Sequence, residues 1–345
     1  MPMESSDRPG GQATAPWKQI FREQWLRPIP ARWILLRHLH ALLVAFLALQ
    51  IATGVLLMAD YHPSAASAFI SMAAIADEAY FGWLIRSMHF WGTHLLLVLA
   101  TLTVAANYFA RAYHGPRVVE WGIQLSLLFV LLGFGFTGTL LPWDQQAYWF
   151  VDLTLKSLAR IPVLGTLLLG LISPETEIGD NTLLRFYVFH IGFLPWLTVL
   201  LLDIRFWTAQ RSDRDELAGD SHASSPGIPF SENVLNVTIT ALLGFGVLVS
   251  VAVLFPPALA GPADPLSPAD SVTPPWYFLA LRGIGAMTSA SATTFLVIAI
   301  ALLLYLAPLL DRDSADSTRR PVLQWSLGAL LLALCVLAGL RGYFP

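Results

Sequence analysis

The sequence predicts an all-α integral membrane protein with seven transmembrane helices, arranged as a four-helix bundle followed by a three-helix C-terminal part. Two compositional observations support this: 56% of the 345 residues are hydrophobic, and 12% are charged, which is about half of the roughly 25% typical of soluble domains. A third is the presence of seven apolar stretches, each near the ~20 residues that a membrane-spanning helix requires. The net charge of −3 gives no basis for nucleic-acid binding.

Each expected span is bounded by polar or turn-forming residues. A further apolar segment, 152–172, is interrupted by Lys156, Arg160 and the Ile161-Pro162 step, so we expect short surface helices there rather than a span. No apolar core with a small-residue cleavage site precedes the first span, and we therefore expect no secretory signal peptide. The seven expected spans are 34–58, 84–109, 119–141, 184–209, 233–256, 292–310 and 321–341.

The chain divides at a polar segment rich in Ser, Asp and Gly between the fourth and fifth spans, which we interpret as a linker between two domains. The predicted organisation is an N-terminal segment 1–32, a four-helix domain 33–210, a linker 211–232 and a three-helix domain 233–345.

Charged residues near the helix ends predict the orientation. Basic residues such as Arg22, Arg117, Arg211 and Arg320 gather at one set of ends, whereas the opposite loops are acidic. Because basic residues mark cytoplasmic loops, we expect a bacterial plasma-membrane protein with a cytoplasmic N-terminus and an extracytoplasmic C-terminus.

The only cysteine, Cys335, excludes an intrachain disulfide and is expected to be a core residue of the seventh span.

Histidines inside the spans are the first candidate functional residues, since ionisable groups there are costly and usually functional. His89 and His190 each lie about six residues from the outer end of their helices, so they can face each other at one depth and ligate one haem iron. The alternative is two separate histidines bonded to backbone carbonyls. His94 lies about 140° around the helix from His89, cannot serve the same iron, and is expected to be bonded within the bundle.

Longer motifs surround these histidines and together resemble the cytochrome b/b6 family of quinol-oxidising bc and b6f complexes. The resemblance runs from about residue 30 to the end and is densest over 50–205. It is carried by Gln50-Ile51-Ala52-Thr53-Gly54, Arg86-Ser87-Met88-His89, Gly115-Pro116-Arg117, the segment from Gly138-Thr139-Leu140-Leu141-Pro142-Trp143 to Trp149, Ile161-Pro162-Val163-Leu164-Gly165, and Thr182-Leu183-Leu184-Arg185-Phe186-Tyr187 ahead of His190.

This resemblance implies that His89 and His190 bind the outer of the family's two haems b. Its haem-pocket residues would be Gln50, Gly54, Arg86 and Gly138, with Arg86 near a haem propionate.

The sequence lacks the residues that the family uses to bind the inner haem. The family's second ligands lie 14 or 15 residues further along each helix, where this chain has Thr103 on one helix and Ile204 and Arg205 on the other. None of these three side chains can ligate iron as histidine does. Three further inner-pocket positions differ: the family's glycines are replaced by His40 and Gln124, and its propionate-facing arginine by Ala106.

We therefore expect one haem b and no second one. A rival hypothesis is that His38 or His40 rescues a displaced inner haem. Arg205 could pair with Asp203 or extend to the cytoplasmic interface, and lipid could fill the vacated pocket.

The expected quinone site also departs from the family pattern. The family's Pro-Glu-Trp-Tyr tetrad reads Pro274-Pro275-Trp276-Tyr277 here, so the glutamate's acid–base role is missing or has moved. The candidate quinone-site residues are Pro142, Trp143, Pro274, Trp276 and Tyr277; alternatively, Trp276 and Tyr277 only anchor a loop at the membrane interface.

The predicted function is that of a subunit of a quinol:electron-acceptor oxidoreductase complex. A single haem would pass electrons between quinol or quinone and an extracytoplasmic partner, such as a Rieske iron-sulfur protein, a c-type cytochrome or another redox subunit, without a complete Q cycle. One alternative is a structural or assembly subunit with a vestigial haem site; a transporter that merely shares the helix spacing is disfavoured by the motifs. The quinone, the direction of electron flow and a dimeric state are left open.

Overall fold

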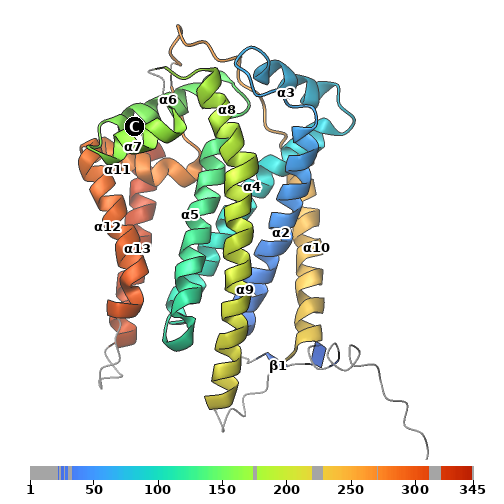
Figure 1. The fold of residues 1–345 in the computed structure, drawn as a ribbon, viewed down its shortest axis with the longest axis vertical. Coiled ribbons are helices and arrows are strands. Elements are labelled where there is room, and N and C mark those ends of the chain that lie inside the picture. The colour runs from blue at the N-terminus through green and yellow to red at the C-terminus, as the bar shows by residue number, and fades with distance from the viewer. Residues whose placement is uncertain are drawn as a thin grey trace, which may run out of the picture.

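The fold of the chain is a bundle of long helices that run side by side, capped at one end by shorter helices (Figure 1). The computed structural model describes residues 22, 25–26, 28–29, 33–173, 177–219, 228–269, 271–310 and 320–343. Most of the predicted N-terminal segment 1–32 and residues 220–227 of the linker 211–232 therefore lie outside the described residues. The two strands described, β1 (Pro28–Ile29) and β2 (Ile228–Pro229), form a short antiparallel pair at the opposite end from the short helices (Figure 1).

The long helices match the predicted spans closely. They are α2 (Ile34–Met58), α4 (Gly82–Phe109), α5 (Val118–Leu140), the continuous run of α8 (Asp180–Val188), η3 (Phe189–Phe193) and α9 (Leu194–Gly219), then α10 (Phe230–Leu254), α12 (Ala290–Leu310) and α13 (Arg320–Tyr343). Six of the described helices are long and apolar enough to cross a membrane, and α13 covers the expected seventh span. The helical membrane fold is thus confirmed, while the count of seven spans stays a prediction.

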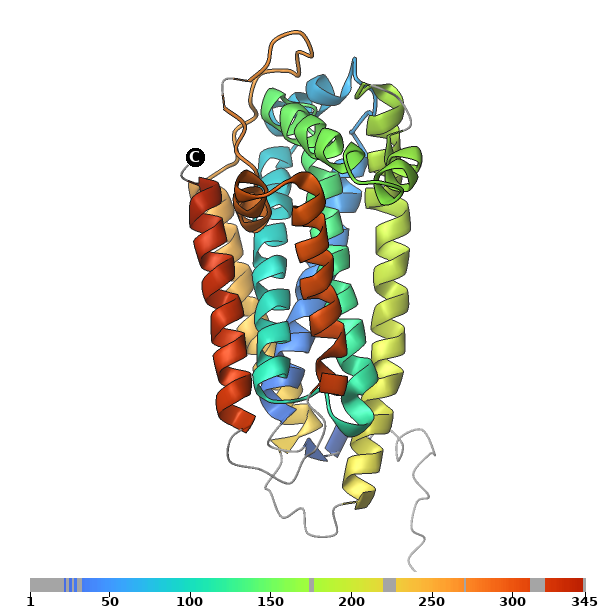
Figure 2. The same ribbon diagram turned by 90° about the vertical axis from the view of Figure 1, so that its left-hand side faces the viewer.

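Shorter helices gather at one end of the bundle: α3 (Ala68–Asp77), α6 (Gln145–Ala159), α7 (Leu164–Ile172) and α11 (Leu279–Met287) (Figure 1). The segment 152–172, expected to form surface helices, lies in α6 and α7. The side chain of Asp144 caps α6 by accepting a hydrogen bond of 2.9 Å from the backbone N–H of Ala147. The helix α13 also ends at this side of the bundle (Figure 2).

The bundle is held together by close packing of α2, α4, α5 and α9, with α10 against α2 and α4 and α12 against α5. Since lipid is as apolar as leucine, association of such helices depends on packing and polar contacts rather than on hydrophobic burial. Outward-facing residues are accordingly large and apolar, for example Leu243 and Phe295. Cys335, expected in the core, is exposed on α13, because an apolar sequence in a membrane helix does not distinguish the lipid-facing side from the interior.

The crossing of α11 and α13 supplies a test of this packing. A Cβ added at Gly283 would overlap the backbone carbonyl of Ala338, whereas one added at Gly339 would meet no atom within 4 Å. We expect Gly283→Ala to destabilise the detergent-solubilised protein by about 1–3 kcal/mol through overpacking, and Gly339→Ala to leave it unchanged. Thermal unfolding of both variants checks this; equal midpoints would contradict the close crossing.

Candidate haem and quinone site

Two histidines from different helices face each other in the half of the bundle that carries the short helices. The ring centroids of His89 on α4 and His190 in η3 are 6.2 Å apart, at an interplanar angle of 67°. Metal–imidazole bonds of about 2 Å would put two ligands on opposite sides of one metal with their centroids about 6 Å apart. The observed separation therefore fits one metal ion between the two rings.

A hydrogen bond fixes which nitrogen of His89 is available. The hydroxyl of Thr53 lies 2.9 Å from His89 Nδ1 and donates its own proton to backbone carbonyls of its helix, 3.0 Å from that of Leu49. The Thr53 oxygen therefore accepts a proton from Nδ1, so the lone pair of the neutral imidazole is on Nε2. This is how a second residue commonly orients a metal-ligating histidine.

His190 is held in the same way from the opposite side. Thr137 Oγ1 lies 3.0 Å from His190 Nδ1 and donates to the backbone carbonyl of Gly133 at 2.9 Å, which again leaves Nε2 with a lone pair. The sequence analysis missed both threonines. The available signal was a repeated Thr-Gly dipeptide, Thr53-Gly54 on α2 and Thr137-Gly138 on α5.

The backbone around His190 is a π-helical turn, Phe189–Phe193, inserted between α8 and α9, where a regular helix was expected. Such turns add one residue to a helix and are frequent at functional sites. The extra residue changes the angular relation between His190 and the residues of α9 that follow it. Spacing along this helix therefore does not translate simply into positions on one face.

Glycines allow the two imidazoles to pack against neighbouring helices. A Cβ at Gly54 would lie 3.2 Å from Cε1 of His89, and one at Gly138 would lie 2.8 Å from Cε1 of His190. The absence of a side chain at these positions therefore makes room for the histidines, and Gly138 is the more restrictive of the two.

A cavity of about 930 Å³ contains this site, within the usual range for cofactor pockets of ~300–1,000 Å³. Both histidines and all four predicted haem-pocket residues line it, and so do Pro142, Pro274 and Tyr277 from the predicted quinone site. Trp143 and Trp276 are not among the described residues that line it. Burial raises the pKa of the Tyr277 phenol, so this hydroxyl stays protonated at neutral pH.

Two other predicted pocket residues lie beside the histidines. The amide of Gln50 donates hydrogen bonds of 3.0 Å to the His89 carbonyl and the Thr93 hydroxyl, while its Oε1 is buried without a hydrogen-bond partner among the described residues. The guanidinium of Arg86 donates to the carbonyl of Pro257 at 2.6 Å. The cation at the cavity wall fits a site that binds a cofactor with anionic groups.

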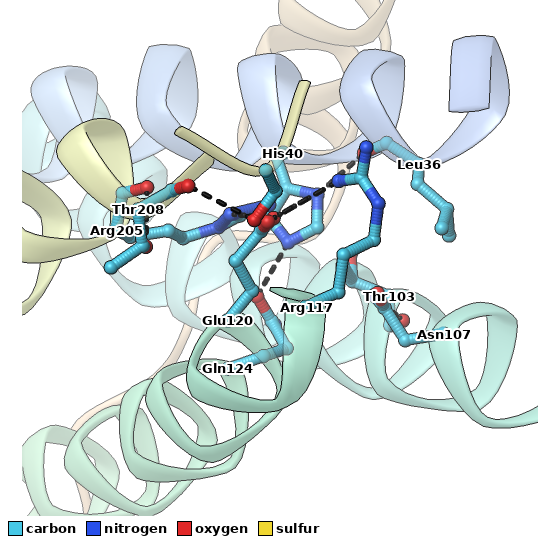
Figure 3. A network of polar contacts seen from close by, with 10 residues as sticks. Leu36, His40, Thr103, Asn107, Arg117, Glu120, Gln124, Arg205 and Thr208 are labelled. Carbon is cyan, nitrogen blue, oxygen red and sulfur yellow. Dashed lines mark hydrogen bonds and ion pairs between the residues drawn. The ribbon is translucent and has the colours of Figure 1, made fainter. Parts of the chain in front are cut away.

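In the other half of the bundle, His40 and Thr103, which stand at positions expected for the inner haem pocket, are bonded to neighbouring protein groups. His40 hydrogen-bonds through Nδ1 to the carbonyl of Leu36 at 2.5 Å and through Nε2 to the side-chain amide of Gln124 at 2.7 Å (Figure 3). Thr103 is fully buried and donates to the carbonyl of Leu99 at 2.6 Å. Both ring nitrogens of His40 are thus occupied by protein groups.

An ionic network lies next to these residues. Glu120 contacts Arg205 at 3.5 Å and Arg117 at 3.3 Å, and all three side chains are largely buried (Figure 3). Arg205 thus pairs with Glu120, a partner that the sequence analysis did not consider, because the bundle brings the start of α5 against α9. The remaining cavity is about 20 Å³, enough for about one water molecule.

The fold and the paired histidines define a multi-pass helical membrane protein with a two-histidine site inside its bundle. Residues 27–211 match the family Cytochrome b/b6/petB, and residues 262–343 match Cytochrome b(C-terminal)/b6/petD. The chain therefore belongs to the cytochrome b/b6 family, in which haem binding and electron transport are typical.

Individual relatives are consistent with membership of this family. The cytochrome bc complex cytochrome b subunit of Chlorobaculum thiosulfatiphilum is 30% identical over 309 residues, covering 86% of this chain and 71% of the relative. Cytochrome b6 of Gloeobacter violaceus is 38% identical over 164 residues, 48% of this chain and 76% of the relative. A solved chain of a hyperthermophilic respiratory Complex III superposes with a TM-score of 0.81 at 25% identity, covering 95% of this chain and 89% of that chain.

Gly138 tests whether the position of His190 matters for cofactor binding. We expect Gly138→Ala to displace the imidazole and weaken haem retention by about 10-fold or more, the usual effect of disturbing a ligand's support. Gly133→Ala is the control on the same helix, since its added Cβ would make an ordinary contact of 3.6 Å with Leu194. Haem per polypeptide in the purified variants is the measurement, and equal haem contents would contradict the expectation.

Glu120 tests the ionic network of the other half. Glu120→Gln leaves two buried guanidinium groups without their carboxylate, which should cost about 3 kcal/mol or more. Lys156→Gln is the comparison, because Lys156 pairs with Asp152 while 63% exposed, and such pairs contribute about 1 kcal/mol or less. Thermal unfolding in detergent compares the two; similar small effects would show that the network is not buried as described.

Proposed function

We propose that this chain is the cytochrome b subunit of a bc-type complex and that it carries one haem b, ligated by His89 and His190. The single observation that carries the proposal is the pair of imidazoles 6.2 Å apart, each with its Nε2 lone pair left free by a threonine. When bound, the haem would supply one-electron redox chemistry. The mostly apolar lining of the cavity would tune its potential.

The other residues of the cavity have supporting roles in this proposal. Thr53 and Thr137 hold the imidazoles in the ligating tautomer, and Arg86 provides a cation for a haem propionate. The apolar lining excludes water from the site. Pro142, Pro274 and Tyr277 line the same cavity, which supports a quinone headgroup binding near the haem.

A single haem is supported by the contents of the other half of the bundle. Both nitrogens of His40 are hydrogen-bonded, and the cavity beside it is about 20 Å³, far smaller than a haem requires. A chain with one haem cannot pass electrons on to the opposite membrane face. We therefore propose that it completes no Q cycle by itself.

The relatives support assembly into a larger complex, since their names include a cytochrome bc complex and a respiratory Complex III. We propose that this chain delivers electrons between quinol or quinone and an extracytoplasmic redox subunit. The proposed orientation puts the short helices α3, α6, α7 and α11, and the paired histidines near them, on the extracytoplasmic side.

A second candidate function is a structural subunit whose haem site is vestigial. The observation that favours it is Pro275, which lines the cavity and has no titratable group where the family has a glutamate. Quinol-dependent reduction of the bound haem separates the two functions.

The stoichiometry of haem is the decisive measurement. We expect one haem b per polypeptide by pyridine haemochromogen in the purified protein, a single redox component, and loss of the haem in His89→Ala. His38→Ala is the control, because His38 instead contacts Thr240 at 3.2 Å. A ratio near two would refute the single-haem proposal, and haem that no quinol reduces would favour the structural subunit.

A further inference from the structure

His94 has the opposite tautomer from the two candidate haem ligands. The indole Nε1 of Trp276 lies 2.9 Å from His94 Nδ1. An indole N–H can only donate, so His94 Nδ1 must accept and the proton of the neutral imidazole is on Nε2. His89 and His190 present a lone pair at Nε2, whereas His94 presents a hydrogen-bond donor there.

His94 lies among aromatic and apolar side chains at the wall of the cavity. His94 lines the 930 Å³ cavity together with Phe90, Pro274 and Tyr277. Its ring centroid is 4.7 Å from that of Phe90 and 6.0 Å from that of Tyr277. Among the described residues it makes no hydrogen bond other than that with Trp276, so its Nε2–H remains available to a ligand.

The position along α4 relates this donor to the redox site. His94 follows His89 by five residues, about 7.5 Å along the helix axis. A ligand bonded to His94 would therefore occupy the same cavity as the cofactor, at a level further along the α4 axis. Pro275, which replaces the family's acidic residue, offers no polar side chain to such a ligand.

We propose that His94 binds a quinone by donating a hydrogen bond from Nε2–H to one carbonyl oxygen, with Trp276 as the positioning residue that fixes the donor tautomer. The proposal rests on the proposed function, because it assigns the quinone headgroup to the cavity of the haem site. A hydroquinone oxygen also has a free lone pair, so the same bond can hold the reduced ligand.

The test uses the purified haem-loaded protein and decyl-ubiquinone as the probe, with ¹³C-labelled carbonyls for infrared spectroscopy. His94→Phe keeps an aromatic ring and removes the donor; His94→Gln keeps a side-chain N–H at similar reach. We expect His94→Phe to bind the quinone about 10-fold more weakly, as for loss of one hydrogen bond. His94→Gln should restore most of the affinity and the downshifted carbonyl band of the wild type.

Trp276→Phe tests whether Trp276 positions the His94 donor or only supports the local structure, through the infrared band of the quinone carbonyl. Without the indole donor, His94 can adopt either tautomer, so the carbonyl band should split or broaden while haem content stays at the wild-type value.

The outcomes are distinguishable. Unchanged affinity and unchanged carbonyl frequency in His94→Phe, with haem and quinone still bound, would overturn this inference and leave the proposed function intact. If the wild type binds haem but no quinone, both the quinone role and this inference fail. If His94→Phe instead releases a tightly held phospholipid and binds quinone normally, the acceptor is a lipid carbonyl and the inference is overturned.

Discussion

The structure depends on one constraint: two imidazoles from different helices lie 6.2 Å apart, centroid to centroid, inside an apolar bundle, and Nε2 is the candidate metal-binding nitrogen of each. Each imidazole has a second nitrogen that would be costly to bury unpaired. Thr53 and Thr137 satisfy these nitrogens and at the same time fix the tautomer. The adjacent glycines let the helices approach closely enough for both bonds to form. Tautomer, helix spacing and ring position are therefore set together.

The two halves of the bundle show two ways to fill the space between the same helices. One half leaves a cavity of about 930 Å³, and the other leaves about 20 Å³ around His40, Glu120 and Arg205. Buried ion pairs contribute little net stability relative to apolar packing, but removing one partner is costly. The Arg117–Glu120–Arg205 network therefore fixes how α5 and α9 pack together. A cofactor with one ligand on each of two helices would link those helices in a similar way.

Sequence reasoning was most accurate for features that depend on neighbouring residues in the chain, such as the bounds of a helix. The predicted first span, 34–58, has the same bounds as α2, and the segment 152–172 forms short helices instead of a span. The depth of His89 and His190 followed from counting residues from the helix ends. The π-turn at Phe189–Phe193 could not be anticipated in this way, because it depends on how neighbouring helices compete for the backbone.

The sequence by itself determined where the long helices lie and the depth of their polar side chains, because the hydrogen bonds of a helix are local and its rise per residue is fixed. Only the tertiary structure decided the partners: Glu120 for Arg205, Gln124 for His40, and Trp276 for His94. These pairs join residues 85, 84 and 182 positions apart. Their formation depends on the rotation and spacing of helices, which the packing of all the side chains between them sets jointly.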